Sequence, residues 1–232
     1  MASDTKQNLV VLTGAGISAE SGISTFRDSG GLWEGYDVME VASPEGWDAD
    51  PKMVLEFYNQ RRLAAREAEP NLAHKLLAQL EEFYNVVVIT QNVDNLHEQG
   101  GSSHVIHLHG ELSKSRSTAR ASLVYDIEGT ELNWGDTCEL GSQLRPNIVW
   151  FGEMVPLLDT AAEYARQADV FAVIGTSLVV YPAAGLIHYV PQDSPIYIID
   201  PKMPTVSDSP NLFKIEKPAT TGTQDMYDIL IN

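Results

Sequence analysis

The chain has 232 residues, 44% of them hydrophobic, and a formal net charge of −17 from 32 acidic and 15 basic side chains. This length fits one domain, or one domain with a small insertion, and the hydrophobic content is ample for a buried core. The charge argues against a nucleic-acid backbone or an anionic membrane surface as a partner, and it is compatible with a basic protein or peptide. Cys138 is the single cysteine, which excludes an internal disulfide and a cysteine-based metal site.

The sequence shows no sign of a membrane or export segment. No run approaches the ~18 apolar residues of a membrane span, and residues 1–8 lack the apolar centre of a signal peptide. We therefore expect a cytoplasmic protein without membrane partners.

The first predicted element is a buried strand that ends in a glycine-rich turn. Val10–Leu12 is apolar, and Gly14, Gly16 and Ala19 then match the G-x-G-x-x-G/A spacing of dinucleotide-binding turns. Gly14 would permit the turn, Gly16 would let the backbone approach a phosphate, and Ala19 would let the following helix pack closely. That helix would favour an anion at its N-terminus. Many α/β proteins carry such a turn and bind no nucleotide, so a purely structural role is the alternative.

The same pattern calls for an acidic residue about 20 positions further on. Glu34 and Asp37 lie near that distance, but residues 24–33 before them show no strand pattern. This segment is more typical of a loop that crosses the site, which disfavours the half-domain of a standard dehydrogenase.

Strands and helices alternate along the rest of the chain. The patterns predict strands at 85–90, 105–108, 147–151, 170–174 and 196–199, and helices at 51–69, 71–83, 157–168, 182–189 and 223–231. Asn71 is the predicted N-cap of its helix. This alternation predicts an α/β fold with a doubly wound parallel sheet covered on both faces. Residues 113–143 are rich in Ser, Thr and Gly, show one fair strand at 122–127, and are typical of a small insertion.

Polar groups follow five of the predicted strands, where ligands of parallel sheets bind. These positions are Thr13 to Gly16, Gln91 to Asp94, His107 to Glu111, Gly175 to Ser177, and Asp200. Packing alone does not explain such a set of amides, carboxylates, hydroxyls and imidazoles. Gln91, Asn92 and Asp94 suit a ligand that carries a carboxamide, such as nicotinamide.

His109, beside Gly110 at a predicted strand end, is the candidate general base because an imidazole titrates near neutral pH. His107 is more simply interpreted as a satisfied core histidine. A metal site formed with His104 is disfavoured, because residue 104 lies on the other strand face and no acidic or cysteine ligand is clearly nearby.

Six ordered blocks, within residues 8 to about 220, resemble those of the sirtuins, the NAD-dependent protein lysine deacylases. The blocks are Gly14-Ala15-Gly16-Ile17-Ser18 with Ser21-Gly22-Ile23, then Thr25-Phe26-Arg27, Gln91-Asn92-Val93-Asp94, His107-Leu108-His109-Gly110, Val149-Trp150-Phe151-Gly152-Glu153 and Gly175-Thr176-Ser177. The resemblance, to bacterial members, implies a Rossmann-like core at about 1–110 and 147–232 and a small inserted subdomain at about 111–146.

The resemblance also implies an activity and a set of site residues. The enzyme would transfer an acyl group from lysine to NAD, giving nicotinamide and 2′-O-acyl-ADP-ribose, with His109 as the base and Asn92 and Asp94 assisting. The peptide would join as a strand beside Val149, Phe151 and Gly152. The implied NAD-binding residues are Gly14, Ala15, Gly16, Ser18, Phe26, Arg27, Trp33, Gln91, Asn92, Asp94, Gly175, Thr176, Ser177, Asp200 and Ala219.

Tyr58 and Arg61 refine the expected substrate. They stand at i and i+3 on a predicted helix, so they share a face. In sirtuins a Tyr-x-x-Arg pair marks members that prefer malonyl-, succinyl- or glutaryl-lysine, and a guanidinium fork suits a carboxylate. The alternative is an aromatic residue on a core face beside a solvated arginine.

The chain departs from sirtuins at the small subdomain. Sirtuins usually carry four cysteines that hold a structural zinc, but here the first pair falls at Ser117 and Arg120, and Cys138 alone remains in the second region. A four-thiolate zinc site cannot form, so we expect no zinc.

Two other functions remain open at this point. A mono-ADP-ribosyltransferase would use the same cofactor with a different nucleophile. A non-catalytic NAD sensor would need the glycine turn but not Asn92, Asp94 and His109 together.

Overall fold

The computed structural model describes residues 6–24, 32–33 and 35–232. Two of the residues expected to bind NAD, Phe26 and Arg27, lie outside these ranges, and so does the side chain of Trp33.

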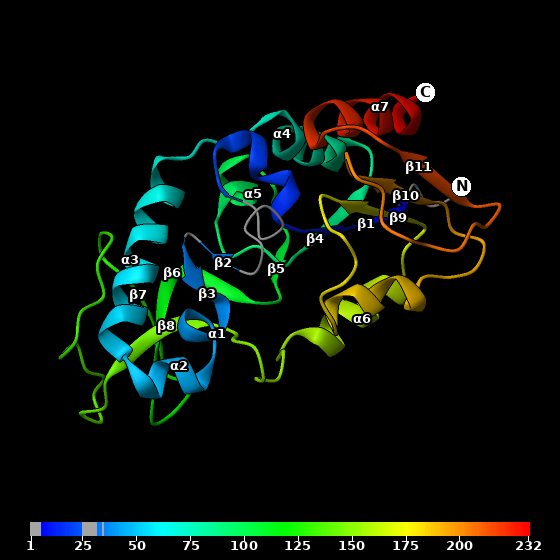
Figure 1. Cartoon of the computed structure of the whole chain (residues 1–232). Coiled ribbons are helices and arrows are strands. Elements are labelled where there is room, and N and C mark those ends of the chain that lie inside the picture. Colours follow the sequence, from blue (N-terminus) through cyan, green and yellow to red (C-terminus); the bar gives the residue numbers. More distant parts are fainter. Residues whose placement is uncertain (1–5, 25–31, 34) are drawn as a thin grey trace.

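Six parallel strands form the largest sheet of the described part of the chain, in the order β11-β10-β9-β1-β4-β5. Renumbered by their order in the chain, these strands run 6-5-4-1-2-3, which is the doubly wound arrangement of Rossmann-like folds. The predicted fold class is therefore confirmed (Figure 1). The bounds are β1 Asn8–Thr13, β4 Asn85–Thr90, β5 Val105–His107, β9 Val170–Ile174, β10 Ile196–Ile199 and β11 Leu212–Ile215.

Helices cover both faces of this sheet because its strands are apolar on both sides. In β1, Leu9 and Val11 pack in one buried cluster, whereas Val10 and Leu12 pack in another. The first cluster lies under α4 (Leu72–Gln79) and α7 (Ala219–Ile231), and the second over α6 (Leu158–Arg166) and the 3₁₀ segment η4 (Ala183–Tyr189). Figure 1 shows α4 and α7 above the sheet and α6 below it.

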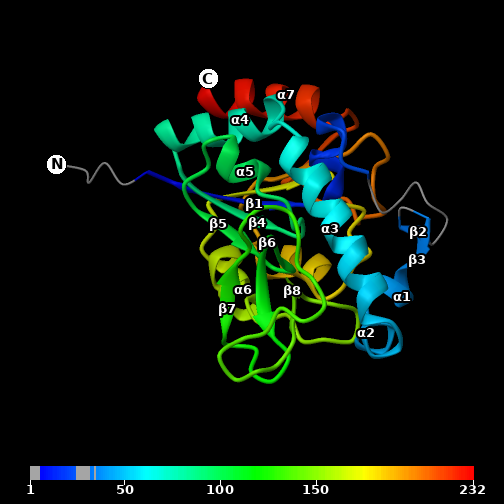
Figure 2. The ribbon, with the colours of Figure 1, turned by 90° about the vertical axis from the view of Figure 1, so that its left-hand side faces the viewer.

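A smaller module lies beside the carboxyl ends of the strands (Figures 1 and 2). It has its own buried cluster, around Phe57, Tyr58 and Trp150. Its antiparallel sheet contains β6 (Gly110–Ser117), β7 (Val124–Asp126) and β8 (Leu144–Ile148), and its helices are α1 (Val38–Val41), α2 (Pro44–Ala49) and α3 (Pro51–Glu67). A short pair, β2 (Leu32–Trp33) and β3 (Tyr36–Asp37), precedes the helices.

Local signals account for where several helices begin. The side chains of Ser43 and Asp50 accept hydrogen bonds from backbone amides at the starts of α2 and α3, and each of these helices has proline in its first turn. Asn71 caps α4 as predicted, within a capping box completed by His74.

The structure differs from the predictions at several elements. The turn after β1 continues as two 3₁₀ segments, η1 (Ala15–Ile17) and η2 (Ala19–Ser21), and not as one helix. Ala19 is exposed, so its predicted role in close helix packing is wrong. The predicted strand at 147–151 is displaced to β8 and pairs antiparallel with β6, outside the parallel sheet. The patterns also missed β6, β11, α1, α2 and the short helix α5 (Leu96–Gln99).

Candidate active site

The site begins where β1 and β9 lie side by side at the centre of the sheet. From these two strands the chain continues toward opposite halves of the sheet, so a crevice is expected beyond their carboxyl ends. Here the amides of Gly14 and Gly16 donate to the carbonyls of Ile174 and Gly175, at 3.1 and 2.8 Å. A Cβ on Gly16 would lie 2.6 Å from the Cα of Gly175, which itself adopts φ +66°. Glycines at these positions let two backbones touch.

Gly16 has a structural role beside the predicted one, and its approach to a phosphate stays a prediction. Its amide is used by the neighbouring strand end, so its absent side chain first serves the packing of the two loops. Gly14, Gly16 and Gly175 themselves carry no side chain, which suits a backbone cradle for a phosphate.

The loop after β4 places its amide and carboxyl groups against the glycine turn. Asn92 Nδ2 donates to the carbonyl of Gly14 (3.2 Å) and to Ser18 Oγ (3.1 Å), and Ser18 Oγ in turn donates to Asp94 Oδ2 (3.2 Å). Gln91 Nε2 donates to Thr176 Oγ1 (3.2 Å). The structure thus brings together the expected residues of three strand ends.

Asp94 is buried, and burial raises the pKa of its carboxyl group, while hydrogen bonds from the Leu96 amide and Ser18 oppose that shift. The carboxyl group is therefore held in a dry environment beside the glycine turn, where a hydroxyl group of a ligand would be a favourable partner.

Sequence reasoning placed Thr13 among the polar groups at the strand ends, but it gave no role to Thr13 or to Thr90, and these two threonines support this loop. Thr13 and Thr90 end β1 and β4, and their hydroxyls are 2.9 Å apart. Thr90 Oγ1 also accepts from the amide of Asn92 (3.0 Å). Both side chains are fully buried. The available signal was a polar residue at the last position of two neighbouring apolar strands.

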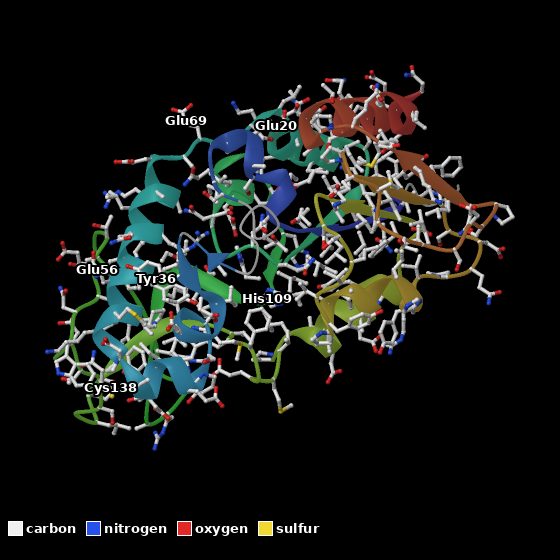
Figure 3. All side chains as sticks on the ribbon, in the orientation of Figure 1. Glu20, Tyr36, Glu56, Glu69, His109 and Cys138 are labelled. Atoms are coloured by element: carbon white, nitrogen blue, oxygen red, sulfur yellow. The ribbon has the colours of Figure 1, made fainter. Side chains whose placement is uncertain are left out.

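His109 follows β5 and lies between the two modules (Figure 3). Its Nδ1 is 3.0 Å from the carbonyl of Gln91. A carbonyl oxygen only accepts, so Nδ1 carries the proton and Nε2 keeps a free lone pair. Burial lowers the pKa of His109, and the bond to Gln91 opposes that shift. The ring is therefore neutral at pH 7 and suited to accept a proton at Nε2.

The neighbouring imidazole has a different role, as the sequence suggested. His107 Nε2 lies 2.7 Å from Glu98 Oε1, and its Nδ1 lies 3.3 Å from the carbonyl of Asn92. Burial acts to lower the pKa of His107, but the bond and charge of Glu98 outweigh it and raise the pKa. With acceptors at both nitrogens, His107 is a structural group.

The residues expected at the far end of the cofactor follow β9, β10 and β11. Thr176 is buried and Ser177 is partly exposed. Asp200, directly after β10, is 1% exposed and accepts from the amide of Lys202 (2.9 Å). Ala219 begins α7 and packs in the core under that helix. Next to it, in an exposed position, Glu20 accepts two hydrogen bonds from Thr220.

The residues expected to bind the acylated peptide come from α3 and from the segment after β8. The amide of Val149 donates to the carbonyl of His109 (2.9 Å), and that of Phe151 donates to the carbonyl of Ala42 (2.9 Å). Phe151 and Gly152 are exposed, whereas Tyr58 is fully buried. Arg61 lies on α3 near Tyr58, with its guanidinium 6.0 Å from the ring centre of Phe57.

The small module does not present a four-thiolate metal site. Cys138 Sγ donates to Ser117 Oγ (3.2 Å), which also accepts from the amides of Ala119 and Arg120 (3.1 and 3.2 Å). Among the described residues, no group of three or more His, Cys, Asp or Glu side chains could hold a metal ion. Figure 3 shows Cys138 far from His109. The residues present do not fit a structural zinc.

Polar bonds from α3 attach the loop before Cys138 to the rest of the module. Asn59 Oδ1 accepts from the amide of Leu132 (2.9 Å), and Arg62 Nη1 donates to the carbonyl of Thr130 (2.8 Å). Arg62 Nε also donates to the carbonyl of Leu112 in β6 (2.6 Å). These side chains hold the loop where sirtuin-like chains would use a metal.

Comparison with known proteins places this arrangement in a family. The model of the "Sir2 family" matches residues 14–182. An "NAD-dependent protein deacylase" from Bacteroides thetaiotaomicron is 54% identical over 97% of this chain and 98% of its own length. A protein of the same name from Helicobacter pylori is 55% identical, again over 97% and 98% of the two chains.

Solved structures agree in fold. A Sir2 homologue mutant in complex with ADP-ribose superposes with a TM-score of 0.88, at 40% identity over 97% of this chain and 92% of its own. A Sir2 homologue in complex with NAD superposes with a TM-score of 0.87, at 39% identity over 98% of this chain and 91% of its own. A Sir2 mutant bound to a p53 peptide and NAD superposes with a TM-score of 0.79, at 32% identity over 98% of this chain and 95% of its own.

A doubly wound sheet with a glycine turn and polar side chains at its central strand ends is typical of a dinucleotide-binding α/β protein. The match over most of its length shows more: this chain belongs to the Sir2 family. No helix in the described ranges is long and apolar enough to cross a membrane.

Proposed function

We propose that the chain is an NAD-dependent protein lysine deacylase whose reaction takes place where β1, β4 and β9 end. Its family, its curated relatives named NAD-dependent protein deacylase, and related structures with NAD or ADP-ribose support this activity. The single observation that carries the assignment is the orientation of His109, whose Nδ1 is fixed by Gln91.

The described residues suit NAD as the cofactor. The contact between Gly16 and Gly175 leaves no room for a Cβ, which gives a bare backbone at the centre of the sheet. NAD, when bound, supplies a ribose carbon that loses nicotinamide and a ribose hydroxyl that receives the acyl group. In our proposal Gln91, Asn92 and Asp94 hold the nicotinamide and its ribose.

The remaining cofactor contacts are also proposals. They divide between the turn after β1, with Phe26, Arg27 and Trp33 beyond it, and the adenosine end. The proposed residues are Gly14, Ala15, Gly16, Ser18, Phe26, Arg27 and Trp33 for the first group, and Gly175, Thr176, Ser177, Asp200 and Ala219 for the second.

His109 would act by taking a proton from the ribose hydroxyl through Nε2. The carbonyl of Gln91 stabilises the imidazolium that forms, because Nδ1–H keeps its acceptor throughout the transfer. The low pKa of His109 keeps the ring ready for this step at neutral pH.

The peptide would bind as an added strand along Val149, Phe151 and Gly152. Phe151 is 42% exposed while its backbone amide is fixed by Ala42, so the segment is held and still accessible. Acylated lysine in a protein or peptide is the proposed substrate.

We further propose a preference for acyl chains that end in a carboxylate, such as succinyl or malonyl. Tyr58 and Arg61 lie close together on α3. The buried phenol is neutral because burial raises the pKa of Tyr58. A neutral phenol and a guanidinium together offer donors that suit a carboxylate.

The cytoplasmic location and the absence of nucleic-acid and membrane partners stay predictions of the sequence.

One assay tests the function. Peptides that differ only in the acyl group on lysine are incubated with NAD, and the products are identified by mass spectrometry. We expect nicotinamide, free lysine and O-acyl-ADP-ribose in equal amounts. ADP-ribose attached to the protein substrate would favour a mono-ADP-ribosyltransferase, and no nicotinamide release with any peptide would favour an NAD sensor.

A further inference from the structure

Trp150, which no part of the proposed chemistry uses, is held at its backbone, its ring face and its ring edge. It is 2% exposed. Its amide donates to Glu153 Oε2 (2.8 Å), and its ring lies 3.2 Å from the guanidinium carbon of Arg145. Its indole Nε1 donates to the hydroxyl of Tyr58 (3.0 Å). A side chain fixed at three points can orient another group.

The bond to Tyr58 decides what the phenol can do. An indole N–H is only a donor, so the Tyr58 oxygen accepts, and the phenol proton is free to point elsewhere. Tyr58 is fully buried, so water does not offer its hydroxyl an alternative hydrogen-bond partner. The donor direction of Tyr58 is therefore set by the position of Trp150.

A partly buried charge cluster holds Trp150 in turn. Arg145 donates to Glu153 Oε1 through Nη1 (2.7 Å) and to the carbonyl of Ile148 through Nη2 (2.9 Å). Arg116 Nη2 donates to both carboxylate oxygens of Glu153, at 3.0 Å each. Glu153 thereby joins β6 to the turn that follows β8 and balances the guanidinium stacked on the indole.

We propose that Trp150 is a specificity-determining residue, which orients the Tyr58 hydroxyl toward acidic acyl chains while Arg145 and Glu153 hold its indole in place. This inference rests on the proposed preference for such chains. Trp150 acts through Tyr58 and is a positioning residue.

The test compares succinyl- and acetyl-lysine versions of one peptide. Trp150→Phe keeps an aromatic ring and removes the N–H. We therefore expect the ratio of kcat/KM for the succinyl peptide to kcat/KM for the acetyl peptide to fall about tenfold. The fall should appear mainly in KM. In a Tyr58→Phe background the same substitution should leave the ratio unchanged, because the bonded oxygen is gone.

Trp47→Phe is the matched control. Trp47 packs beside the same indole, with ring centres 5.7 Å apart, and its loss should leave the ratio as in the wild type. If Trp150→Phe does not fold, Arg145→Lys replaces it, since lysine keeps the charge near Glu153 but cannot stack as a plane. We expect the same direction of change in the ratio.

The failures can be told apart. A wild-type enzyme that does not remove succinyl or malonyl groups overturns both the acidic pocket and this inference. If the wild type removes succinyl and Tyr58→Phe weakens that activity, an unchanged ratio in folded Trp150→Phe or Arg145→Lys overturns the inference alone.

Discussion

The Nδ1 atom of His109 donates a hydrogen bond to the backbone carbonyl of Gln91 across 3.0 Å, which leaves Nε2 as the nitrogen that can accept a proton. The residue expected to act as a base and a residue expected to meet nicotinamide are thus joined directly. Two strand ends, those of β4 and β5, are coupled through this bond.

His109→Ala should lower kcat by about 10²- to 10⁴-fold, because it removes the proton acceptor and leaves the glycine turn intact. NAD affinity, measured by calorimetry, should change little. His104→Ala is the control, since His104 is exposed and packs edge-to-face against Tyr164. Wild-type turnover in His109→Ala would remove His109 from the role of base.

The pH dependence of turnover follows from the environment of His109. Burial lowers the pKa of this imidazole, so its neutral form persists to a pH below the ordinary value near 6.5. Activity should therefore be constant through neutral pH and fall as acid protonates Nε2, with an acidic midpoint below about 6.5 in kcat/KM. A midpoint above that value would contradict the desolvated environment.

Gly16→Ala should disrupt the contact between the loops after β1 and β9. The added methyl group would lie 2.6 Å from the Cα of Gly175 and 2.7 Å from its carbonyl oxygen, so one backbone must move. We expect a loss of about 1–3 kcal/mol of stability in chemical denaturation, and weaker NAD binding. Gly185→Ala, where the nearest atom is 3.8 Å away, is the control and should match the wild type.

Arg61→Met should impair the removal of succinyl groups much more than the removal of acetyl groups. Methionine keeps much of the aliphatic length but removes the guanidinium, so kcat/KM for succinyl-lysine peptide should fall roughly 10- to 100-fold. The value for acetyl-lysine peptide should fall much less. Equal losses on the two peptides would reject the acidic pocket, and parallel thermal melts would show whether the fold is kept.

The small module should be stable without zinc. Ser117 and Cys138 are joined by a hydrogen bond, and Asn59 and Arg62 hold the preceding loop. Elemental analysis of the purified protein should find well below one zinc per chain, and a chelator should leave Tm unchanged. One zinc per chain, or a large fall in Tm with chelator, would contradict this expectation.

The apolar patterns of the sheet were readable because each strand is buried on both faces. The predictions for 85–90, 170–174 and 196–199 match β4, β9 and β10. The short antiparallel strands were harder to read, because β6 mixes serine, lysine and arginine with single apolar residues and gains its order from pairing with β8. The segment at 147–151 was apolar enough to predict a strand, but no local signal indicates which sheet it joins.

The sequence by itself determined the fold class, the family resemblance and the residues at the strand ends, because burial on two faces and the spacing of polar groups are properties of the chain alone. Only the tertiary structure decided which nitrogen of His109 is free, that Gly16 meets Gly175, and that Trp150 holds Tyr58. These relationships join residues 18 to 159 positions apart, and hydrogen-bond partners at such separations are chosen by packing and not by local propensity.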